Sequence, residues 1–162
     1  LMQLTRNISF EEMTLTSHRK YLEKNRAEGE RLIGTLKATA QMLQRVRNKW
    51  DKPLIIHSGF RGKALNRVIG GSKLSQHCLA EAADFHIVGV ELEEVFEWIW
   101  KESGLKFGQL IGEGVVKDRF SWIHLSLGSP FRKANRSGEV LSWSKSEGYK
   151  MLATGVNHPT TS

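Results

Sequence analysis

The chain has 162 residues, of which 40% are hydrophobic and 25% are charged, and its formal net charge is +7 at pH 7. This length and composition predict a single globular domain with its own hydrophobic core rather than two domains. No run of 18 consecutive apolar residues occurs, so we expect neither a membrane span nor a signal peptide. The single cysteine, Cys78, excludes an internal disulfide.

The positive charge favours a polyanionic partner, which could be nucleic acid, an anionic membrane or a wall polymer that carries carboxylates and phosphates. Lysines and arginines are scattered from Arg6 to Lys150, and no run of them is long enough to form a nucleic-acid-binding arm. Charge alone therefore does not choose among these partners.

In chain order, the pattern first predicts helices. Ser9 and Glu12 have the spacing of a capping box that opens a short helix. Apolar residues at three- and four-residue steps predict a long amphipathic helix over residues 28–50, which ends before Pro53. Residues 62–76 contain paired glycines and are expected to form a loop, or a short helix followed by a loop.

The remaining pattern predicts mainly strands. Strands are expected within residues 53–60, 81–88, 107–114 and 120–128, a helix over residues 92–103, and an edge strand over residues 139–144. This order predicts an α+β fold: one domain, residues 1–150, with a central mixed or antiparallel sheet and helices packed on one side. Residues 151–162 are expected to form a flexible C-terminal tail.

Strand alternation groups chemically interesting residues. If residues 81–88 are extended, Asp84 and His86 share the face opposite the core. The same rule places His124 opposite the core on its own strand, and His77 reaches the same point if its loop folds back. Two imidazoles and one carboxylate, with a position left for water, are typical of a catalytic zinc site.

The motifs also carry a family resemblance. In order and spacing, "SGFR", "LNRVIGG", "SQHCLAEAAD", "QLIGE" and "WIHLS" resemble the zinc D-Ala-D-Ala carboxypeptidase family of peptidoglycan peptidases, and within it the small phage-type members. Its wider superfamily, the LAS group, includes lysostaphin-type enzymes and the hedgehog domain. Ser75, His77, Ala80, Ala82, Asp84, Trp122 and His124 match the family pattern in turn, with Ala80 where glycine is usual.

The resemblance implies roles for individual residues. His77, Asp84 and His124 correspond to three ligands of one zinc ion per chain. Arg61 corresponds to the arginine that binds a substrate carboxylate or stabilises the oxyanion, a task that suits a planar and always charged guanidinium. Ser75 is expected to contact substrate or to orient the loop.

The general base is less directly implied. Many relatives have an acid three residues before the last histidine, but Ser121 stands there in this chain. We expect Glu113, on the preceding strand, to act as the base instead, with Asp118 as the alternative.

Other candidates surround these residues. Gln109 and Trp122 are expected to contact substrate, and His86 to support the zinc ligands as a hydrogen-bonding neighbour. His57 and Cys78 are interpreted as structural residues.

The implied function is a zinc metallopeptidase that hydrolyses the peptidoglycan stem peptide through a zinc-activated water, as a D-Ala-D-Ala carboxypeptidase or an L-Ala-D-Glu endopeptidase. A non-catalytic zinc-containing binding module of the same fold is the alternative. We expect a monomer without nucleic-acid or membrane partners. It would be synthesised in the cytoplasm and act on the bacterial cell wall, in the periplasm or outside the cell, with phage lysis or a virion as one route of delivery.

Overall fold

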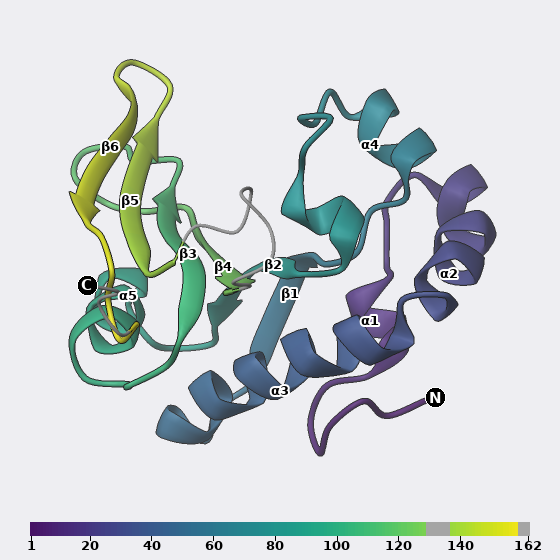
Figure 1. Ribbon diagram of the computed structural model, residues 1–162, viewed down its shortest axis with the longest axis horizontal. Helices are drawn as coiled ribbons and strands as arrows, with labels where there is room; N and C mark the ends of the chain where they lie inside the picture. The colour runs from purple at the N-terminus through teal and green to yellow at the C-terminus, as the bar shows by residue number, and fades with distance from the viewer. Residues whose placement is uncertain (129–136, 159–162) are drawn as a thin grey trace.

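The computed structural model describes residues 1–128 and 137–158, and these form one α+β domain (Figure 1). The helices are α1 (Phe10–Met13), α2 (Leu22–Glu30), α3 (Ile33–Trp50), α4 (Lys63–Val68) and α5 (Leu92–Lys101), with two 3-10 turns at Arg19–Tyr21 and Gln76–Leu79. The strands are β1 (Leu54–Ser58), β2 (Ala82–Ile87), β3 (Phe107–Glu113), β4 (Trp122–Leu127), β5 (Glu139–Ser144) and β6 (Gly148–Ala153).

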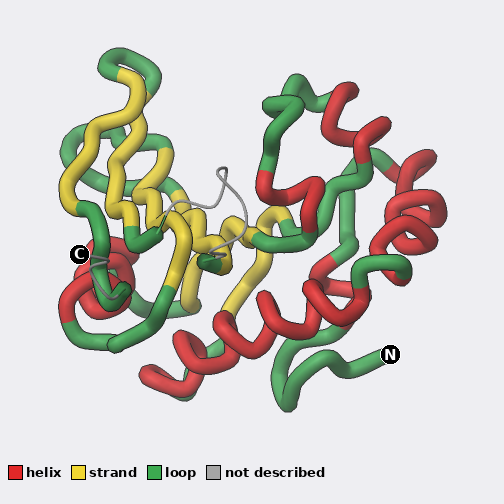
Figure 2. Tube along the Cα trace, viewed as in Figure 1, coloured by secondary structure: helices red, strands yellow, loops and turns green. Residues whose placement is uncertain are grey.

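The strands form one mixed sheet in the order β1-β2-β4-β3-β5-β6. Neighbouring strands are antiparallel except for β3 and β5, which run parallel. Figure 2 shows the strands extending towards one side of the molecule, while α1, α2 and α4 gather at the opposite side. The predicted fold class is therefore confirmed.

One face of the sheet carries the hydrophobic core. Ala83, Phe85 and Ile87 of β2 point to this face and are buried. They belong to one cluster with the apolar stripe of α3 and with the buried face of α5. Trp50 and Trp98 join these two helices, with ring centroids 5.3 Å apart. Because α3 and α5 cover this face, polar side chains of the central strands must lie on the other.

The N-terminal helices follow the sequence signals closely. The Ser9 side chain accepts a hydrogen bond from the Glu12 N–H, and the Glu12 carboxylate accepts one from the Ser9 N–H, so the predicted capping box is present. The long helix predicted over residues 28–50 is shorter at its start, since α3 begins at Ile33 after a break between α2 and α3. It ends at Trp50, and the residue that caps it, Asp51, has a left-handed backbone with φ 51°.

Two expectations for the C-terminal part need correction. Residues 139–144 do form a strand, but β5 is not at the edge, because β6 pairs with it on the outside. The tail expected from residue 151 begins inside β6, which extends to Ala153. Beyond β6, Asn157 Nδ2 donates to the Leu105 carbonyl at 3.0 Å, and His158 Nε2 is 2.7 Å from the Phe107 carbonyl oxygen. Residues 159–162 of the expected tail lie outside the described residues.

None of the helices within residues 1–128 and 137–158 combines the length and the apolarity needed to cross a membrane.

Candidate active site

The pairing of β2 with β4 creates the centre of the site. Asp84 lies directly opposite His124 in this antiparallel pair, on the face away from the core. His77 joins them from the 3-10 turn Gln76–Leu79, which leads into β2. Asp84 Oδ1 is 2.9 Å from His124 Nδ1 and 3.4 Å from His77 Nε2. One ligand atom from each of the three residues lies within 4.8 Å of the others, so they could hold a metal ion.

The turn that carries His77 is fixed by its own residues. The Ser75 hydroxyl accepts a hydrogen bond from the His77 N–H, which caps the start of the turn. Ala80 ends it with a left-handed backbone, φ 61°. The Ala80 carbonyl accepts a 2.7 Å hydrogen bond from the buried hydroxyl of Thr39 on α3. The left-handed conformation explains why glycine, which has no Cβ, is favoured at this position.

Hydrogen bonds determine which nitrogen of each histidine faces the cluster. His77 Nδ1 is 2.8 Å from the carbonyl of Gly59, which can only accept, so Nδ1 carries the proton and Nε2 faces Asp84. His124 Nε2 is 3.0 Å from Gln76 Oε1, so Nε2 carries a proton and Nδ1 faces Asp84. Each imidazole therefore has an outer acceptor and an inner nitrogen available to a metal, an arrangement usual for metal-ligating histidines.

The donor set fits zinc. Two neutral imidazole nitrogens and one carboxylate oxygen are among the ligands that zinc accepts in catalytic sites. Both histidines are buried, with 4% of His77 and 6% of His124 exposed, so the inner nitrogens are shielded from bulk water. Burial raises the pKa of Asp84, but the charge of His77 in its protonated form, and the hydrogen bonds that protonated His124 and His77 donate, lower it by more. The Asp84 carboxylate therefore stays ionised, as a metal ligand must.

Glu113 lies beside this centre. It is the last residue of β3 and pairs with Trp122 of β4. Ile111, two residues earlier on β3, pairs with His124. Because alternate residues of a strand point to the same face, Glu113 shares the site face with His124. Burial raises the pKa of Glu113 and the charge of Asp84 raises it further, whereas the charges of His124 and Arg61 oppose these effects. A carboxyl group with a raised pKa next to the cluster is suited to proton transfer.

The alternatives for the base are less favourably placed. Asp118 is exposed in the β3–β4 connection and has a left-handed backbone, φ 63°. Ser121 is exposed as well, and its hydroxyl donates to the Gly114 carbonyl at 2.8 Å. Glu113, by contrast, is partly buried and lies on the site face.

Arg61 and Ser75 meet at the other side of the cluster. Arg61 Nη2 donates to Ser75 Oγ at 3.3 Å, and the Arg61 N–H donates to the His77 carbonyl at 3.1 Å. The charge of Arg61 lowers the pKa of Glu113, so the two groups lie near enough to interact electrostatically. The loop after β1 and the turn before β2 thus bring both residues to one place.

The three remaining candidates have other contacts. His86 Nδ1 is 2.7 Å from His57 Nε2 on the neighbouring strand β1. Gln109 Nε2 donates to Glu139 on β5 at 3.0 Å. Trp122 lies on the site face, and its indole Nε1 is buried without an acceptor among the described residues. The contacts of His86 and Gln109 run along the sheet rather than to His77, Asp84 or His124.

Sequence reasoning missed Gln76, the Gly59 carbonyl and the aromatic residues of the β5–β6 hairpin. Glu113, Trp143 and Tyr149 form one row across β3, β5 and β6. The Trp143 and Tyr149 ring centroids are 6.4 Å apart. Burial, and then the charges of Glu113 and Asp84, raise the pKa of the Tyr149 hydroxyl. The aromatic residues Trp143 and Tyr149, on either side of a glycine-containing turn, could have indicated this hairpin.

Comparison with known proteins gives one result. No curated protein matches the chain. A family model described as Peptidase M15 matches residues 6–126, which is more than half of the chain and includes the whole His77–Asp84–His124 cluster. The chain therefore belongs to the Peptidase M15 family, a family of metal-dependent peptidases.

Proposed function

We propose that this protein is a zinc-dependent peptidase that cleaves the stem peptide of bacterial peptidoglycan. The observation that carries the proposal is the buried cluster of His77, Asp84 and His124, in which both histidines turn a nitrogen inward and hold their proton outward. These three residues would hold one zinc ion. When bound, zinc lowers the pKa of water towards neutrality and polarises the carbonyl of a peptide bond.

Glu113 is proposed as the general base. Its raised pKa brings it closer to the working pH, at which a carboxyl group can both accept and return a proton. Glu113 would take the proton from the attacking water. It would then deliver that proton to the nitrogen of the leaving amine, so that one residue serves as base and then as acid.

Arg61 is proposed to bind negative charge on the substrate. Its guanidinium contacts Ser75, and its charge lowers the pKa of Glu113. A planar cation there would stabilise the oxygen that becomes negative as the peptide bond is attacked, or it would anchor a substrate carboxylate. Either action would place the scissile bond between the cluster and Glu113.

The substrate class follows from the resemblance and from charge. A stem peptide carries free carboxylates, and a chain with a net charge of +7 would be attracted to the anionic wall. We favour L-Ala-D-Glu endopeptidase action, with D-Ala-D-Ala carboxypeptidase action as the alternative. We further propose that the protein acts as a monomer on the cell wall, without nucleic-acid or membrane partners.

The test is digestion of purified peptidoglycan and of soluble muropeptides by the zinc-loaded protein, with products identified by mass. New peptides that begin with D-Glu would indicate the endopeptidase, and released D-Ala the carboxypeptidase. Glu113→Ala is the matched control and should retain zinc while losing turnover. If the zinc-loaded wild type binds peptidoglycan but releases no product, the protein is a binding module and the peptidase proposal is wrong.

A further inference from the structure

The loop at residues 59–62, which contains Arg61, lies against the N-terminal helices. The Phe60 N–H donates to the Met13 carbonyl at 2.7 Å, which ties the loop to the end of α1. A Cβ on Gly59 would clash with the Met13 backbone, and a Cβ on Gly62 would clash with the Glu28 carboxylate on α2. Gly59 therefore permits a close approach that other residues would prevent, whereas at Gly62 the flexible Glu28 side chain could move aside.

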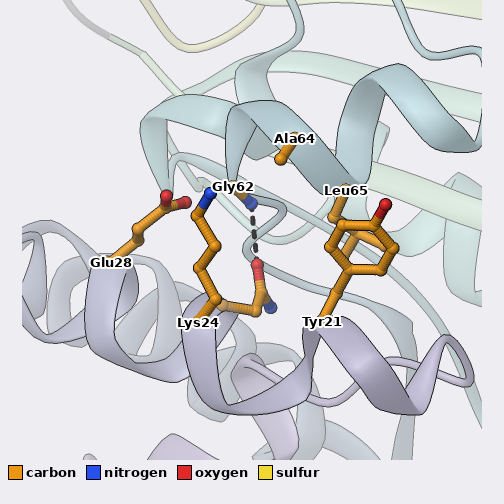
Figure 3. A pocket seen from close by; sticks show the side chains of 7 residues that line it. Tyr21, Lys24, Glu28, Gly62, Ala64 and Leu65 are labelled. Carbon is orange, nitrogen blue, oxygen red and sulfur yellow. Dashed lines mark hydrogen bonds between the residues drawn. The ribbon is translucent and has the colours of Figure 1, made fainter.

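The side chain of Asn25, on α2, holds this loop through hydrogen bonds. It is 2% exposed, and it uses both ends of its side-chain amide. Its Nδ2 donates to the Thr14 carbonyl at 2.8 Å and to the Phe60 carbonyl at 3.1 Å. Its Oδ1 accepts from the Gly62 N–H at 2.7 Å. Figure 3 shows this last hydrogen bond as a dashed line that ends at the Gly62 nitrogen.

The two contacts with the loop bracket Arg61. Asn25 hydrogen-bonds to the carbonyl of Phe60, which precedes Arg61, and to the N–H of Gly62, which follows Arg61. The N–H of Arg61 itself donates to the His77 carbonyl, so the backbone of Arg61 is fixed between α2 and the 3-10 turn that carries His77. An amide that satisfies several buried backbone groups resists displacement, since each group left unpaired would cost free energy.

The Arg61 side chain has weaker restraints of its own. Its Nε is buried without a partner among the described residues, and its hydrogen bond to Ser75 is 3.3 Å long. The point from which the side chain extends is therefore set by the backbone, while the burial of Nε and the contact with Ser75 restrain the guanidinium itself. That backbone is the part of the loop that Asn25 holds.

We propose that Asn25 is a positioning residue for Arg61. It fixes the peptide groups on both sides of Arg61, and in this way it aims the guanidinium at the substrate space beside Glu113. The inference rests on the proposed function only in treating that guanidinium as a substrate-binding group.

A double-mutant cycle tests the proposal. Asn25→Ala, Arg61→Ala and the double variant are compared with wild type by kcat/KM on a muropeptide, each as the zinc-loaded full chain. Asn25→Ala is expected to lower kcat/KM by about 10- to 100-fold, as expected for a displaced positioning group. In the Arg61→Ala background the same change should cost less than about twofold. Equal losses in both backgrounds would show that Asn25 does not act through Arg61 and would overturn the proposal.

Ser103→Ala is the matched control. Ser103 donates to the Ile99 carbonyl at 2.6 Å at the end of α5, so its loss also removes a hydrogen bond from a side chain to the backbone. It should lower the melting temperature while leaving kcat/KM unchanged. If Asn25→Ala does not fold, Asn25→Asp enters the same cycle, because it keeps the acceptor for the Gly62 N–H and removes the donor to Phe60.

A second readout needs no catalysis. Nitrogen-15 relaxation of the Arg61 Nε–H reports how firmly the guanidinium is held, and its order parameter should fall in Asn25→Ala or Asn25→Asp. An unchanged order parameter would refute the proposal even if the wild type releases no peptide. Absence of product from the wild type would refute the proposed function alone, so the two failures are distinguishable.

Discussion

Gln76 offers the most direct test of the proposed metal site. Its Oε1 is the acceptor for the Nε2 proton of His124, at 3.0 Å, and the residue is only 7% exposed. Gln76→Leu keeps the approximate volume but removes this acceptor. The buried His124 proton would then be unpaired, and the imidazole would lose the contact that keeps Nδ1 turned towards Asp84.

The expected size of the effect follows from that contact. Loss of the outer acceptor of a metal-ligating histidine weakens metal binding by about 10- to 100-fold, equivalent to roughly 1.4–2.7 kcal/mol. The cost of leaving one buried donor unsatisfied, about 1–3 kcal/mol, covers the same range. Gln76→Glu restores an oxygen acceptor, so its zinc affinity should remain at or above that of wild type.

The assay is competition for zinc between the protein and a chromophoric chelator at neutral pH. Gln109→Leu is the matched control, because Gln109 hydrogen-bonds to Glu139 rather than to a histidine of the cluster. Its zinc affinity should equal that of wild type. If Gln76→Leu folds normally and binds zinc as tightly as wild type, the assignment of the His124 proton to Nε2 is wrong.

Three further predictions concern the base, the hairpin and the turn. The fold raises the Glu113 pKa, so this carboxyl stabilises the metal-free fold only while protonated, and the contribution disappears as the pH rises through the folded pKa. Glu113→Gln should therefore abolish hydrolysis, yet raise the melting temperature of metal-free protein more at about pH 8 than at about pH 4. Tyr149→Ala should raise KM several-fold without changing zinc affinity, whereas Lys150→Ala, on the opposite face of β6, should change neither. Ala80→Gly should alter the unfolding free energy measured in urea by less than about 1 kcal/mol, because relief of the left-handed strain offsets the lost methyl burial. Ala80→Val, branched at Cβ, should destabilise by about 2 kcal/mol or more, and a neutral result would contradict the strain argument.

The part of the site that depends on local alternation was predictable. Side chains alternate along a strand, so the sequence alone placed Asp84 opposite the buried Ala83 and Phe85, and the structure has them so. The same rule placed His124 opposite Ile123, and the pairing of β2 with β4 then brings it to Asp84. The capping box of α1 was predictable for a similar reason, because its two residues are three positions apart.

The supports of the site were not predictable, because each joins segments that are remote in sequence. The Gly59 carbonyl accepts a hydrogen bond from His77, 18 residues away. The Gln76 side chain accepts one from His124, 48 residues away. Asn25 reaches Gly62 across 37 residues, and nothing in its own neighbourhood marks it. A zinc-site motif names the atoms that contact the metal, whereas the tautomers and directions of those atoms are decided by long-range packing. The residues that tune this site are therefore to be sought among its buried amides and carbonyls rather than among its charged groups.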